Sequence, residues 1–75
     1  MQPITETKSL GLLIRKERKA QKLTQEQLAG LTGVGVRFVR ELEAGKASCQ
    51  LGLTLQVVAA LGLSVSISSR RESAP

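Results

Sequence analysis

The stretch over residues 23–46 constrains the fold more than any other part of the chain, because it encodes two short helices joined by a tight turn. Thr24 can act as an N-cap for the first helix, and Gln27 follows three residues later, as in a capping box. Two glycines within residues 32–35 favour a turn after that helix. The second helix is expected over residues 36–44, with a glycine next that can take the left-handed conformation.

The second helix of this pair is expected to have a basic outer side. At about 100° per residue, Phe38, Val39 and Leu42 share the apolar side. The opposite side carries Val36, Arg37 and Arg40. A single helix fits the major groove of DNA, where arginine can donate a forked pair of hydrogen bonds to a base. The alternative is a basic helix face that is only solvated.

Composition argues for a polyanionic partner and against catalysis. The chain has 11 Lys and Arg residues against 6 Glu and Asp, a net charge of +5, and no histidine or aspartate. Without these residues, nucleophile–base pairs and metal sites lack their usual components, so we expect neither an enzyme nor a cofactor. Phe38 is the single aromatic residue and is expected to face inward, which favours duplex DNA over stacking on single strands.

The chain is short and holds one cysteine. Its 75 residues allow one small domain, which is marginal alone and is expected to recruit a second subunit. Cys49 cannot form an internal disulfide and is interpreted as an ordinary small residue in a loop. The lack of disulfides predicts a cytoplasmic location, and no apolar run approaches the roughly 20 residues that cross a bilayer.

Before the two-helix stretch, the sequence predicts an arm and a first long helix. Residues 1–8 are expected to form a flexible arm, and the helix is expected from Ser9. One side of this helix is basic, with Arg15, Lys16 and Lys19. Leu12 lies among these residues and has no evident intramolecular role, which suggests contact with a partner protein.

The C-terminal third predicts a dimer interface. Residues 52–61 are apolar on nearly every side of a helix, so a second subunit is expected to cover part of it. Residues 63–68 then alternate apolar side chains with serines, which is typical of a strand. A lone strand is unstable, so we expect it to pair with its twin in a homodimer, followed by a disordered tail over residues 69–75. The expected dimer residues are Leu53, Val57, Leu61, Leu63, Val65 and Ile67.

The Leu-Thr-Gln-x-x-Leu-Ala opening and Glu-Leu-Glu-x-Gly-Lys close of residues 23–46 resemble the helix–turn–helix of the XRE family, which includes the lambdoid phage repressors. The resemblance extends from about Leu10 to Gly62. It implies an all-α, four- to five-helix, lambda-repressor-like DNA-binding domain over residues 9–62. Two departures are that Lys22 stands where the family usually has Gly or Asn, and Gly35 where a polar residue often begins the recognition helix.

The resemblance also implies base-reading residues on the recognition helix, at Val36, Arg37 and Arg40. Arg37 could donate both arms of its guanidinium to a guanine, and Val36 could contact a thymine methyl. Arg40 could serve a base or a phosphate.

Three further residues, Arg18, Gln25 and Glu43, occupy positions that have a role in the family. Gln25 falls where the family holds a phosphate, and Lys46 is a second candidate phosphate contact; the alternative for each is a solvated side chain. Arg18 and Glu43 fall where the family has an ion pair that ties the first helix to the recognition helix.

The helix, glycine and strand of the C-terminal third resemble the HipB-type DNA-binding antitoxins. This resemblance implies a homodimer that binds a palindromic operator of its own operon, with a HipA-type kinase toxin as partner. We therefore expect a sequence-specific, duplex-binding repressor located with the nucleoid. The alternatives are a stand-alone or prophage XRE regulator without a toxin, and a protein–protein adaptor with the same fold.

Overall fold

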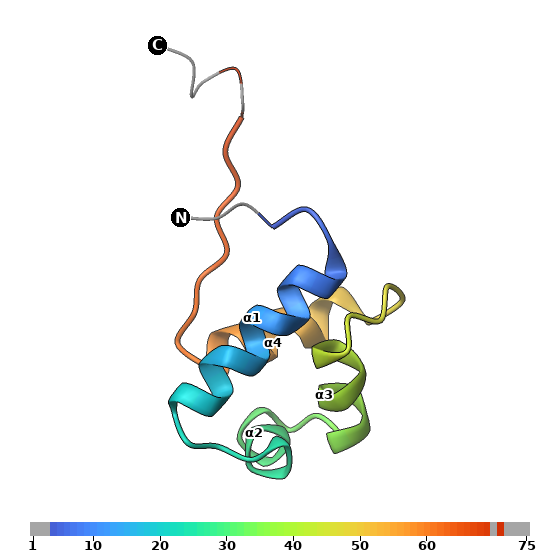
Figure 1. Ribbon diagram of the computed structural model, residues 1–75, viewed down its shortest axis with the longest axis vertical. Helices are drawn as coiled ribbons and strands as arrows, with labels where there is room; N and C mark the ends of the chain where they lie inside the picture. The colour runs from blue at the N-terminus through green and yellow to red at the C-terminus, as the bar shows by residue number, and fades with distance from the viewer. Residues whose placement is uncertain (1–3, 70, 72–75) are drawn as a thin grey trace.

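Four helices make up the folded body of the protein in a computed structural model that describes residues 4–69 and 71. They are α1 (Thr7–Ala20), α2 (Gln25–Thr32), α3 (Val36–Glu43) and α4 (Leu51–Ala60), arranged as Figure 1 shows. The expected all-α class is confirmed. The first helix begins at Thr7 rather than at Ser9, so the end of the predicted arm is helical. Residues 1–3 of that arm lie outside the described residues.

The start and end of α2 follow the local sequence signals. The Thr24 hydroxyl accepts a hydrogen bond from the Gln27 backbone N–H at 3.0 Å, and the Gln27 side chain accepts one from the Thr24 N–H at 2.8 Å. This reciprocal pair is the expected capping box, and it satisfies two N–H groups that have no partner within the helix. Gly33 ends α2 with a φ of 76°, which a residue without a Cβ adopts at no steric cost.

The N-terminal half of α1 packs closely on the C-terminal end of α3. A Cβ on Gly11 would lie 2.5 Å from the carbonyl oxygen of Leu42, so only glycine fits at this contact. The Thr7 hydroxyl donates a hydrogen bond of 2.8 Å to the carbonyl of Gly45, which follows α3 with a φ of 83°. These contacts fix the orientation of α3 relative to α1.

Each helix contributes one fully buried side chain to the core. These four residues are Ile14, Leu28, Val39 and Val57. Half-buried side chains close the edge of the core, among them Phe38, as expected, and Cys49, which packs there as an ordinary small residue. Because helices α2 and α3 present their apolar sides inward, their polar sides remain on the surface.

The structure corrects the prediction for α4. Val57 and Leu61, which we assigned to a dimer interface, are 0% and 3% exposed and belong to the core of their own subunit. The exposed stripe of α4 instead carries Leu51, Leu55 and Ala59. A helix that is apolar on nearly every side has no periodic signal that selects its inner face, and the packing of α4 on α2 makes the choice.

The segment after α4 leaves the helical body, as Figure 1 shows. In the single chain, residues 63–69 form neither helix nor strand, so the pairing of two strands across a dimer stays a prediction. Leu63 packs against the core of its own subunit, whereas Val65 and Ile67 are exposed. Within the described residues, no helix is both long and apolar enough to span a bilayer.

Candidate nucleic-acid interface

A buried ion pair joins α1 to the end of α3. Arg18 donates through Nε to Glu43 Oε2 at 2.6 Å and through Nη2 to Oε1 at 3.0 Å. Its third nitrogen donates to the carbonyl of Leu23 at 2.8 Å, just before α2. The two residues are 8% and 7% exposed, so the forked pair is shielded from water. The structure therefore places Arg18 and Glu43 together, as the family resemblance implied.

Gln25 completes the environment of this pair. Its side-chain amide donates a hydrogen bond of 3.1 Å to Glu43 Oε1, so the Gln25 side chain is held by the protein and is not simply solvated. Burial would raise the pKa of Glu43, but the hydrogen bonds from Arg18 and Gln25 outweigh it and hold that pKa below its ordinary value. The same hydrogen bonding to Glu43 raises the pKa of Arg18. The carboxylate is thus held in its charged form.

A second, exposed charge network lies on α3 and the residues after it. Glu41 Oε2 is 3.1 Å from Lys46 Nζ and 3.5 Å from Arg37 Nε. The hydrogen bond from Lys46 is the main cause of a lowered pKa at Glu41, and Arg37 adds to it. Lys46 is therefore positioned by Glu41 rather than extended freely into solvent. Glu41 lies at the margin of the arginine-bearing side of α3, a position that predicts it holds an arginine, and its i,i+4 contact with Arg37 confirms this.

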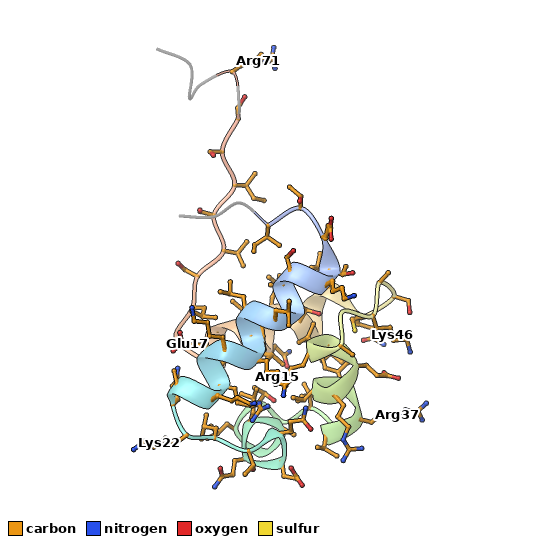
Figure 2. All side chains as sticks on the ribbon, in the orientation of Figure 1. Arg15, Glu17, Lys22, Arg37, Lys46 and Arg71 are labelled. Carbon is orange, nitrogen blue, oxygen red and sulfur yellow. The ribbon has the colours of Figure 1, made fainter. Side chains whose placement is uncertain are left out.

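The three predicted base-reading residues differ in exposure. Arg37 has a side chain that is 87% exposed, and Figure 2 shows it projecting outward from α3. Arg40 is also exposed. Val36 is half-buried and packs against the core, so only part of its side chain faces outward. The outer side of α3 is consequently dominated by the two arginines.

A cleft of about 430 Å³ opens between α1, α2 and α3. It is lined by Arg15, Arg18, Gln25, Arg40, Glu43 and Ala44. The sequence grouped Arg15 with a basic helix side considered for contact with a partner protein, but Arg15 lies three residues before Arg18 and therefore on the same side of α1. That spacing was the signal that could have identified it.

Lys22 lies in the turn between α1 and α2 and has a φ of 60°. It is the only described residue other than glycine with a positive φ. The family resemblance places Gly or Asn here, and the left-handed backbone explains that preference. Nothing among the described residues suggests a metal site, since no three His, Cys, Asp or Glu side chains gather there.

The helix-turn-helix domain family matches this chain over residues 9–67. The chain belongs to that family. An uncharacterized HTH-type transcriptional regulator of Sinorhizobium fredii (strain NBRC 101917 / NGR234), y4mF, is 52% identical over 58 residues, which cover 77% of this chain and 76% of the relative. The helix-turn-helix assignment thus rests on a match to most of the chain.

Solved structures of HipB have the same fold. A HipA-HipB-O2-O3 complex matches with a TM-score of 0.85 and a HipB-O4 20mer complex with 0.84. Each match covers 93% of this chain and 99% of the other, at 20% sequence identity. The expected HipB-like fold is confirmed by these matches. The helix-turn-helix protein therefore carries its exposed arginines on the second helix of the motif.

Proposed function

We propose that this helix-turn-helix protein is a DNA-binding transcriptional regulator that inserts α3 into the major groove of duplex DNA. The observation that carries the proposal is Arg37, a long forked donor that stands almost fully exposed on α3. The Arg18–Glu43 pair and the close contact at Gly11 hold α3 rigidly beneath it. A preorganised arginine loses little freedom when it donates to guanine O6 and N7.

The phosphate contacts in this proposal lie on either side of α3. Gln25 stands in the first turn of α2, where backbone N–H groups point outward and favour an anion. One hydrogen of its amide is used by Glu43, which leaves the second for a phosphate oxygen. Lys46 lies beyond the other end of α3 and can supply positive charge there.

The finer proposal is an autoregulating repressor and DNA-binding antitoxin of a HipBA-like system, working in the cytoplasm without catalysis. Its support is the shared fold with HipB, which has been solved in complex with HipA. A stand-alone or prophage regulator without a toxin, and an adaptor that keeps only the fold, are the competing functions. A kinase encoded beside this gene would favour the toxin–antitoxin function over the stand-alone one.

We further propose that the protein acts as a homodimer on a palindromic operator. The support is the exposed apolar stripe of α4 at Leu51 and Leu55, half-buried Leu53 beside it, and exposed Val65 and Ile67 beyond the helix. A two-fold dimer would place its two copies of α3 roughly 34 to 36 Å apart, one turn of DNA. Val57 and Leu61 have no place in this interface because the core occupies them.

The test is an electrophoretic shift titration of Arg37→Ala on a duplex selected from a random pool by the wild-type protein. We expect affinity to fall on the order of tenfold and the preference at one base pair to relax. The Arg37 side chain is 87% exposed, so its removal should leave α3 folded. Lys19→Ala, which removes one charge from the end of α1, is the control.

Unchanged affinity and unchanged base preference in Arg37→Ala would refute the base-reading role. The salt dependence of DNA affinity distinguishes a DNA-binding protein from an adaptor. A duplex-binding protein loses affinity steeply as salt rises, whereas an adaptor shows only weak attraction to DNA at low salt.

A further inference from the structure

The cleft between α1, α2 and α3 has a neutralised floor and basic walls. Arg18 and Glu43 form the floor, where each charge is balanced by the other at 2.6 Å. Arg15 on α1 and Arg40 on α3 form opposite walls, and both are exposed. Figure 2 shows Arg15 over the middle of the molecule between these two helices, whereas Arg37 points away from it.

The two wall arginines lack acidic partners within residues 4–69 and Arg71. The ion pairs there use Arg18, Arg37 and Lys46, and neither Arg15 nor Arg40 takes part in one. The one carboxylate lining the cleft, Glu43, already accepts three hydrogen bonds from Arg18 and Gln25. The cleft therefore carries an uncompensated charge of about two, which favours an anion at its mouth.

The neighbouring groups indicate which anion fits. Gln25 lines the same cleft from the first turn of α2, and its amide has a second hydrogen directed away from Glu43. Two guanidinium groups and an amide can donate hydrogen bonds to both non-bridging oxygens of a backbone phosphate, which carries one negative charge. Because the cleft adjoins α3, a phosphate in it would belong to the same duplex that α3 enters.

We propose that Arg15 and Arg40 clamp a single backbone phosphate of the bound duplex from two different helices. This inference rests on the proposed function and deepens it. It makes α1 part of the DNA interface, and it moves Arg40 from the base-reading set to the backbone-binding set. Arg37 then supplies the direct arginine contact to a base.

The experiment compares Arg15→Ala, Arg40→Ala and the double variant with the wild-type protein on two duplexes, one selected by the wild type and one of unrelated sequence. Affinity is measured across a range of salt. Lys16→Ala is the matched control, because it removes an equal charge from the neighbouring position of α1, outside the cleft. Thermal melting of each variant checks that the fold is retained.

If the two arginines share one phosphate, each single variant should bind both duplexes on the order of tenfold more weakly, with the ratio of the two affinities unchanged. In the double variant, the magnitude of the negative slope of log affinity against log salt should fall by about 0.9, the value expected when one phosphate contact is lost. A fall of about 1.8 would mean two separate phosphates and would overturn the shared clamp.

Four other outcomes would also overturn the clamp. If Arg40→Ala changes base preference, Arg40 contacts a base. If the cleft variants match Lys16→Ala while Arg37→Ala still alters base preference, the clamp is wrong and the proposed function stands. If selection from the random pool yields no duplex that the wild-type protein binds, both the clamp and the proposed function fail. Inorganic phosphate that weakens binding more than sulfate at equal ionic strength would indicate a site for the free anion instead.

Discussion

Lys22 is a residue whose side chain disfavours the backbone conformation that it adopts. A side chain with a Cβ is strained at a φ of 60°, and the turn between α1 and α2 nevertheless requires that conformation. The capping box at Thr24 fixes the start of α2 two residues later, so the turn cannot relax without losing a helix start. The strain is thus local, and the rest of the fold maintains it.

We predict that Lys22→Gly raises the free energy of unfolding by about 0.5 to 1 kcal/mol. Relief of left-handed strain exceeds the added entropy of the unfolded chain. Chemical denaturation measures the change. Lys16→Gly places the same substitution inside α1 and should lower stability by about 1 kcal/mol. Equal destabilisation by both variants would show that the turn carries no strain.

Sequence predicted single residues well where a position has one local role. The capping pair Thr24 and Gln27 needs only its own helix, and Cys49 had no possible partner. Gln25 was harder, because its hydrogen bond is to Glu43, 18 residues away on another helix. Helical periodicity describes one helix at a time and cannot give such a contact between two of them.

At the scale of elements, α1, α2 and α3 meet at Glu43. This last residue of α3 accepts hydrogen bonds from Arg18 on α1 and Gln25 on α2. One carboxylate therefore sets the relative positions of the three helices that carry the candidate interface. Its two partners lie on different elements, so a displacement of either helix costs a buried hydrogen bond.

We predict that the protein loses stability in acid through Glu43. The lowered pKa of Glu43 means that its stabilising effect is present above the unfolded-state value of 4.5 and is lost as pH falls through the folded-state value. Glu43→Gln should cost roughly 3 to 5 kcal/mol at pH 7, because it leaves Arg18 buried without a counter-charge. It should also flatten the pH dependence of stability below pH 5.

Denaturation midpoints of the wild type and Glu43→Gln between pH 7 and pH 3 measure this effect. Glu41→Gln is the control, since Glu41 also has a lowered pKa but belongs to an exposed network, and it should change stability little. A wild-type acid transition that persists unchanged in Glu43→Gln would assign the acid sensitivity to another carboxyl group.

Elements were predictable to different degrees. Both helices of the motif followed their caps and glycines, whereas the inner face of α4 was assigned wrongly. In α3, charged and apolar residues alternate with a helical period and leave one possible inner face. In α4 polar residues are few, so Val57 and Leu55 are equivalent until another helix packs against one of them.

For the whole molecule, the decisive feature is apolar surface that the single chain leaves uncovered. Leu51 and Leu55 are 70% and 44% exposed on α4, and Ile67 is 95% exposed beyond it. A chain of 75 residues has few other means of gaining stability than burying such surface against a second copy. The sequence predicted that a second subunit is needed. The structure changes which leucines are expected to contact that subunit.

We predict that Leu55→Asp weakens dimerisation by at least tenfold, because a carboxylate would enter an apolar interface. Sedimentation equilibrium measures the dimer constant. Leu31→Asp is the control, since Leu31 is a 66% exposed leucine on α2 and lies off the α4 stripe. A truncation after Gly62 should weaken the dimer as well. Identical constants for Leu55→Asp and Leu31→Asp would exclude α4 from the interface.

In α3, the residues that anchor the helix in the core are separate from the exposed arginines, and this separation affects how such a protein can acquire new DNA targets. Val39, Leu42 and Glu43 anchor the helix, while Arg37 and Arg40 contribute nothing to the core. Arg37 can therefore be exchanged with little cost in folding stability, and the same scaffold can acquire a different base preference by substitutions at a few exposed positions of α3. Diversification of this kind keeps every anchoring side chain unchanged.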